Sequence, residues 1–138
     1  MKNILLASDG SEHALRATKK AIELCSYIRG ATVTVVYVIN TTTAKTDVLL
    51  EGNIEERDAM RKKRLSSTEA LLKEANIPYE IRLLRGEPGP AIVEFANAHP
   101  FDLVIVGSRG LNTLQEMVLG SVSHKVAKRV EAPVLIVK

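Results

Sequence analysis

The chain has 138 residues and a mass of 15.1 kDa, which is the size of a single domain. Hydrophobic residues make up 46% of it, enough to bury a core, so a disordered chain is excluded. Aromatic residues make up only 4% and the formal net charge is +3, a combination that argues against a nucleic-acid partner. We therefore expect one domain over residues 1–138 with an aliphatic core.

The sequence shows no sign of targeting or of a membrane span. The first apolar stretch ends at Ser8 and Asp9, which is too short for a signal peptide. No stretch approaches the roughly 18 apolar residues of a transmembrane helix. The single cysteine, Cys25, cannot form an internal disulfide and falls on an apolar helical stripe, which predicts a buried thiol. These features predict a cytoplasmic protein without a membrane partner.

Five apolar runs have the length of β-strands. Four are nearly continuous, which is typical of strands buried on both faces of a parallel sheet. The run at Tyr79–Leu84 alternates apolar and charged residues, so we expect it at an edge of the sheet. The five runs are Ile4–Ala7, Val33–Ile39, Tyr79–Leu84, Leu103–Val106 and Val134–Val137.

Helical patterns lie between the runs. The first is predicted from an N-cap at Ser11 to a terminating Gly30. The second opens at a capping box of Asn53 and Glu56 and ends near Ala75. The third begins at Gly89-Pro90, and the fourth carries a stripe of Val122, Val126 and Val130. Residues 40–52 show little periodicity and predict a loop. The alternation of strands and helices predicts βαβ crossovers in a mostly parallel sheet.

In such a sheet, ligands bind beyond the carboxyl ends of the strands. Ser8-Asp9-Gly10-Ser11 follows the first strand. The carboxylate of Asp9 could accept hydrogen bonds from ribose hydroxyls or help to hold a cation beside phosphates. Alternatively, Asp9 caps the helix that follows.

The fourth strand is followed by Gly107-Ser108-Arg109-Gly110 and, ten residues later, by Gly120-Ser121-Val122-Ser123. Glycines let a backbone approach a phosphate closely, and free N–H groups at a helix N-terminus favour an anion. Ser121 and Ser123 could donate from their hydroxyls, and Arg109 carries a fork suited to phosphate. Alternatively, the glycines only make a tight turn. The segment matches neither the Walker A loop nor G-x-G-x-x-G.

The spacing G-x-x-G, nine residues and G-[ST] resembles the nucleotide-binding signature of the universal stress protein family, with Gly107, Gly110, Gly120 and Ser121 in its four positions. The likeness extends over the chain. It includes the opening from Ile4 to Ser11, Val36-Tyr37-Val38, Gly86 to Gly89, Asp102 to Ser108, and Ala132 to Val137.

The resemblance implies a Rossmann-like α/β fold with five parallel strands in the order 3-2-1-4-5 and helices on both faces. It also implies ATP as the ligand, with Mg²⁺ or Mn²⁺. Ala7, Ser8, Asp9 and Val38 would hold the adenine and ribose. Backbone groups of Gly107, Ser108, Arg109 and Gly110 would line the phosphate path, and Gly120, Ser121, Val122 and Ser123 would bind the phosphates. Arg109 occupies a position that varies in the family.

Three functions remain open from the sequence. The first is an ATP-binding regulatory or protective stress-response module. The second is an enzyme that slowly hydrolyses ATP or phosphorylates itself, for which no clear catalytic base is visible. The third is a dimeric interaction module without nucleotide. In the family's strand order Val134–Val137 is an edge strand, which predicts a homodimer through that edge.

One further cluster is basic. Arg57, Arg61, Lys62, Lys63 and Arg64 lie close together in the second predicted helix. The cluster could contact nucleic acid, but Glu55, Glu56 and Asp58 precede or interrupt it, which is typical of a solvated helix face.

Overall fold

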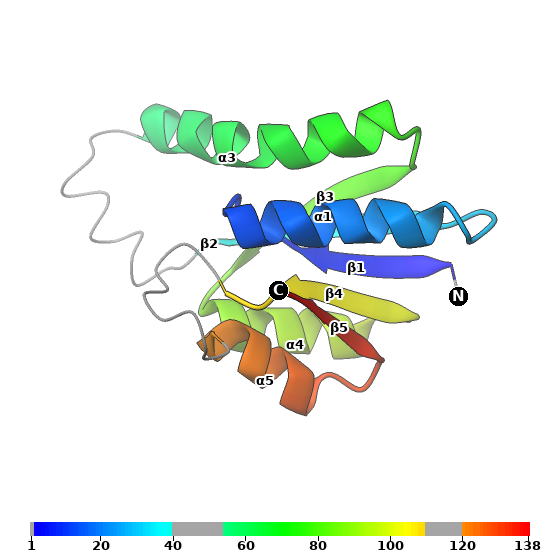
Figure 1. Ribbon diagram of the computed structural model, residues 1–138. Helices are drawn as coiled ribbons and strands as arrows, with labels where there is room; N and C mark the ends of the chain where they lie inside the picture. The colour runs from blue at the N-terminus through cyan, green and yellow to red at the C-terminus, as the bar shows by residue number, and fades with distance from the viewer. Residues whose placement is uncertain (1, 40–53, 110–119) are drawn as a thin grey trace.

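The computed structural model of the chain describes residues 2–39, 54–109 and 120–138. The described residues form alternating strands and helices (Figure 1). In chain order these are β1 (Asn3–Ala7), α1 (Glu12–Cys25), β2 (Thr32–Ile39), α3 (Ile54–Glu74), β3 (Tyr79–Arg85), α4 (Pro88–Ala98), β4 (Leu103–Gly107), α5 (Ser121–Arg129) and β5 (Val134–Val137).

The strands form one parallel sheet in the order β3-β2-β1-β4-β5. This confirms the predicted fold class and strand order, including the edge position of β3. β1 is central, with Ile4 paired to Val33 of β2 and to Leu103 of β4. Its residues Ile4, Leu5 and Leu6 are fully buried, as expected for a strand covered on both faces.

Helices cover both faces of the sheet. Figure 1 shows α1 and α3 on one face and α4 and α5 on the other. Because side chains alternate along a strand, neighbouring residues enter different cores. Leu6 packs in the cluster with α1 and α3, whereas Leu5 packs in the cluster with α4 and α5. Both clusters are almost entirely aliphatic, which agrees with the low aromatic content.

The structure differs from the predicted helix ends in two places. Helix α1 ends at Cys25, not near Gly30, because Ser26 caps it with its backbone N–H and the chain then turns. Ile28 still packs on the core, but from that turn. Helix α4 begins at Pro88, one residue before the predicted start, since proline suits the first helical turn. The loop predicted over residues 40–52 and the cap at Asn53 lie outside the described residues.

Candidate functional site

In open α/β sheets a ligand-binding crevice forms where the strand order reverses, which in this chain is between β1 and β4. β2 and β3 lie on one side of β1, and β4 and β5 lie on the other. Helix α1 follows β1 on one face, and α5 follows β4 on the other face (Figure 1). The loops after β1 and β4 therefore begin side by side, at the point where α/β sheets bind ligands.

The loop after β1 is held by its own polar groups. The N–H of Ser8 extends the ladder by donating to the Val36 carbonyl at 2.9 Å. The Asp9 Oδ1 atom accepts the Ser11 N–H at 2.9 Å, and the Ser11 Oγ atom accepts the Ala14 N–H at 3.2 Å. Ser11 is thus the N-cap of α1, as predicted, and Asp9 is not. Half-buried Asp9 lies two residues before this N-cap, outside the helix.

The two halves of the glycine motif after β4 are joined by one carbonyl group. The Ser108 carbonyl accepts the Gly120 N–H at 2.8 Å and the Ser123 hydroxyl at 2.9 Å. The Ser108 N–H donates to the Val137 carbonyl at 2.8 Å, which fixes Ser108 to the end of β5. The N-terminus of α5 therefore lies directly at the carboxyl end of β4.

The first turn of α5 offers donors to an anion. Gly120 is the N-cap and has no side chain to accept hydrogen bonds. The N–H groups of Ser121, Val122 and Ser123 have no acceptor within an α-helix, and the helix dipole adds partial positive charge there. The Ser121 side chain is exposed at this end. Ser123 is only 2% exposed, and its hydroxyl already donates to Ser108 and Gly120, so it holds the loop in place.

Gly107 is required by packing, and Gly120 is closely packed. A Cβ atom on Gly107 would lie 2.9 Å from the carbonyl oxygen of His13, so α1 rests directly on the end of β4. A Cβ atom on Gly120 would lie 3.3 Å from the Ser108 carbonyl oxygen. Neither residue has a positive φ angle. Residue spacing alone did not identify His13 and Ser108 as the neighbours of these glycines.

The remaining predicted site residues have different surroundings. Ala7 is the last residue of β1 and Val38 lies near the end of β2, and both are half-buried against the core that faces α4 and α5. Arg109 follows Ser108 and is half-buried. Gly110 lies outside the described residues.

Two residues of α3 that the sequence interpretation did not assign to the site contact the loop after β1. The Oγ1 atom of buried Thr68 lies 3.4 Å from the Ser8 Oγ atom. A Cβ atom on Gly10 would lie 2.8 Å from the Cβ atom of Arg64. No spacing along the chain could have revealed these contacts, because they join elements more than 50 residues apart.

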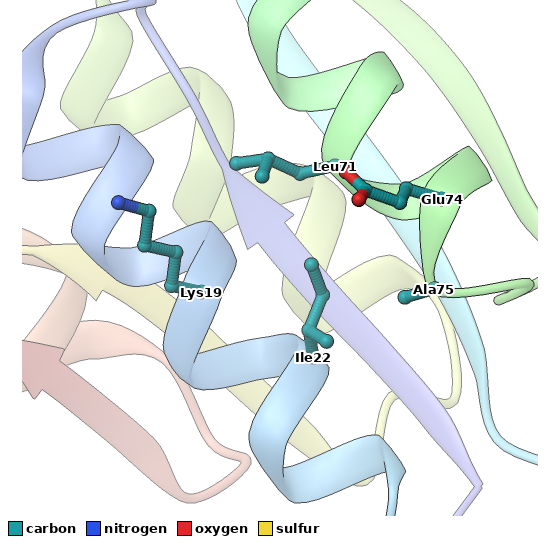
Figure 2. A pocket seen from close by; sticks show the side chains of 5 residues that line it. All are labelled: Lys19, Ile22, Leu71, Glu74 and Ala75. Carbon is teal, nitrogen blue, oxygen red and sulfur yellow. The ribbon is translucent and has the colours of Figure 1, made fainter.

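A hollow of about 250 Å³ lies elsewhere, between α1 and the C-terminal turn of α3 (Figure 2). Its lining residues are Lys19, Ile22, Leu71, Glu74 and Ala75. Because both helices run opposite to the strands, these positions lie toward the amino ends of the strands, away from the crevice. Within the described ranges, no group of three or more His, Cys, Asp or Glu side chains could hold a metal ion, and no helix is long and apolar enough to cross a membrane.

Known proteins resemble this chain in sequence and in fold. A sequence model of the universal stress protein family matches residues 1–138. A universal stress protein of Thermus aquaticus is 37% identical over 142 residues, which cover 99% of this chain and 98% of that protein. The solved structure of MJ0577, from Methanocaldococcus jannaschii, has a TM-score of 0.81 at 29% identity and covers 99% of this chain and 95% of its own.

Two further solved structures contain nucleotides. A universal stress protein in complex with cAMP has a TM-score of 0.70 at 27% identity, with 99% of this chain and 96% of that chain covered. The universal stress protein of Archaeoglobus fulgidus in complex with dAMP has a TM-score of 0.70 at 25% identity, with 100% and 98% covered. Both are adenine nucleotides.

Proposed function

Since the chain belongs to the universal stress protein family, we propose that it binds ATP at the carboxyl ends of β1 and β4 and acts as a regulatory or protective stress-response module. The observation that carries this proposal is the N-terminus of α5, which Ser108 holds at the end of β4 beside the loop that bears Asp9. A helix N-terminus in this crevice is a site for phosphate.

The nucleotide would lie across the crevice. Ala7, Ser8, Asp9 and Val38 would hold the adenine and ribose, with the Asp9 carboxylate accepting hydrogen bonds from ribose hydroxyls. Backbone groups from Gly107 to Gly110 would line the phosphate path. The segment from Gly120 to Ser123 would bind the phosphates, through the first-turn N–H groups of Ser121, Val122 and Ser123 and the exposed Ser121 hydroxyl. The relatives with cAMP and dAMP support an adenine nucleotide as the ligand class.

A divalent cation, Mg²⁺ or Mn²⁺, would accompany ATP. The described residues offer no three-residue ligand cluster, so the cation would be held mainly by phosphate oxygens, as Mg²⁺ usually is. Asp9, which follows β1, would contribute a carboxylate beside the phosphates. The cation would neutralise phosphate charge.

Binding without committed catalysis is the role we favour. The Asp9 carboxylate is engaged with the Ser11 N–H, and the buried Ser123 hydroxyl donates to two carbonyls. Slow ATP hydrolysis or autophosphorylation at Ser121 is the alternative, and turnover that Asp9→Ala abolishes without loss of ATP binding would establish it.

Two properties of the whole chain complete the proposal. We propose a homodimer through the edge strand β5, and a cytoplasmic location without a nucleic-acid partner. The modest net charge of +3 and the aromatic content of 4% support the absence of a nucleic-acid surface.

A valine at Gly120 tests the site. Its Cβ atom would lie 3.3 Å from the Ser108 carbonyl oxygen and 3.4 Å from the Arg109 Cα atom, so the two methyl groups of valine would crowd the junction between β4 and α5. We expect Gly120→Val to lower the affinity for ATP with Mg²⁺ by at least about tenfold in isothermal titration. Ala127→Val, on the exposed surface of the same helix, should leave the affinity unchanged. A wild-type protein that binds no ATP would refute the proposal.

A further inference from the structure

The loop after β1 lies against Arg64, a member of the basic cluster on α3. A Cβ atom on Gly10 would lie 2.8 Å from the Arg64 Cβ atom and 2.9 Å from its carbonyl oxygen. One turn further along α3, Thr68 approaches Ser8 through their hydroxyl oxygens at 3.4 Å. Helix α3 therefore supports the loop that bears Asp9 at two successive turns.

The Arg64 side chain also reaches β2. Its Nη1 atom donates to the Tyr37 Oη atom at 3.2 Å. Tyr37 is only 5% exposed and directly precedes Val38. Arg64 thus contacts Gly10, which follows Asp9 in the loop, and Tyr37, which precedes Val38 in β2. The contact with Gly10 is made by the backbone and the Cβ atom of Arg64, whereas the guanidinium, whose donors are held in fixed directions, makes the contact with Tyr37.

These contacts lie at the nucleoside end of the proposed site. Asp9 and Val38 are the proposed ribose and adenine contacts, whereas the proposed phosphate donors belong to α5. Helix α3 covers one face of the sheet and α5 covers the other (Figure 1). Because the Val38 side chain packs toward α4 and α5, Arg64 acts on Val38 only through Tyr37 and the backbone of β2. The preceding residue, Lys63, is exposed like Arg64 and carries the same charge, but its side chain leaves the helix about 100° away from that of Arg64.

We propose that Arg64 is a positioning residue for the nucleoside half of the ligand. Through Gly10 and Tyr37 it fixes the Asp9 loop relative to the end of β2, and thereby sets the distance between the ribose and adenine contacts. This inference rests on the proposed function, since it requires an adenine nucleotide in the crevice. It predicts that Arg64 contributes equally to every ligand that contains adenosine, whatever the number of phosphates.

The test is a set of isothermal titrations of adenosine, AMP and ATP with Mg²⁺ into the full chain. Arg64→Gln should weaken all three by a common factor on the order of tenfold, because a charge-assisted hydrogen bond is lost. Tyr37→Phe, which removes only the acceptor, should weaken all three in the same way. The double variant should be no weaker than Arg64→Gln alone, because both changes remove one interaction. Arg64→Lys should recover part of the affinity.

Lys63→Gln is the matched control, with the same charge change on the same helix, and its affinities should stay within about twofold of the wild type. Melting temperatures without ligand show whether each variant is folded. A loss confined to ATP, a Lys63→Gln loss equal to that of Arg64→Gln, or unchanged affinities in Arg64→Gln would each overturn the inference while leaving the proposed function intact. A wild-type protein that binds none of the three ligands overturns both.

Discussion

Gly10 and Gly30 have nearly the same backbone conformation but different surroundings. Their φ angles are +80° and +78°, in the left-handed region that costs other residues roughly 1–2 kcal/mol. A Cβ atom on Gly30 meets nothing within 4 Å, whereas one on Gly10 meets the backbone of Arg64 at 2.9 Å. Comparing alanine substitutions at Gly10 and Gly30 therefore separates the cost of the backbone conformation from the cost of contact with α3.

We expect Gly30→Ala to lower the free energy of unfolding by roughly 1–2 kcal/mol. Gly10→Ala should cost at least about 1 kcal/mol more, because the loop must move off α3. Urea denaturation of the two variants and the wild type measures both values. Equal losses in the two variants would contradict the contact between Gly10 and α3.

At the scale of residues the sequence predicted a local cap better than contacts between distant residues. The sequence predicted Ser11 as the cap of α1, because a hydroxyl before a helical stripe has a local signature. It did not predict that Gly107 is needed for contact with His13, or that Arg64 meets Tyr37 and Gly10. Those contacts depend on how helices pack on the sheet, which residue spacing does not encode.

Among the elements, β1 and β4 are tied together at their amino ends by one carboxylate. The Asp102 Oδ2 atom accepts the N–H groups of Lys2 and Asn3 at 2.8 and 2.9 Å. Hydrogen bonds from Asn3 and then Lys2 lower the pKa of Asp102 below its ordinary value, since they favour the ionised form. A lowered folded-state pKa stabilises the protein above the unfolded-state pKa, and the effect is lost as the pH falls through the folded-state pKa.

Asp102→Asn should therefore lower the melting temperature at pH 7, where Asp102 is ionised in the wild type. The difference from the wild type should shrink below about pH 4. Thermal melts from pH 7 to pH 3 measure it, with Glu94→Gln, an exposed position on α4, as the control. A difference that stays constant over this range would show that the charge of Asp102 does not stabilise the fold.

The elements themselves were largely predictable, but their ends were not. Continuous runs such as Leu103–Val106 have only one stable environment, the centre of a two-layered core, so their strands were found. The predicted end of α1 was wrong because Ile28 continues the helical spacing of apolar residues, although it packs on the core from the turn after the helix. The predicted alternation of β3 also breaks, since Leu83 is 55% exposed and Leu84 joins the core instead.

For the whole molecule, β5 leaves one edge of the sheet open to a second copy. The Ser108 N–H donates to the Val137 carbonyl, and the Val104 N–H donates to the Pro133 carbonyl. Backbone groups of alternate residues point to opposite sides of a strand, so the N–H and C=O groups of Ile136 point away from β4, toward the free edge. We expect light scattering at micromolar concentration to give twice the chain mass of 15.1 kDa. Ile136→Pro removes an outward N–H and should give a monomer. A wild-type monomer would contradict the dimer.

The central claim is that this chain holds an adenine nucleotide between the loop of Asp9 and the N-terminus of α5. Mass spectrometry of freshly purified wild-type protein under native conditions, before and after addition of ATP with Mg²⁺, tests it most directly. We expect a population heavier than the chain by one adenine nucleotide, either as purified or after the addition. A spectrum that shows only the bare chain under both conditions would contradict it.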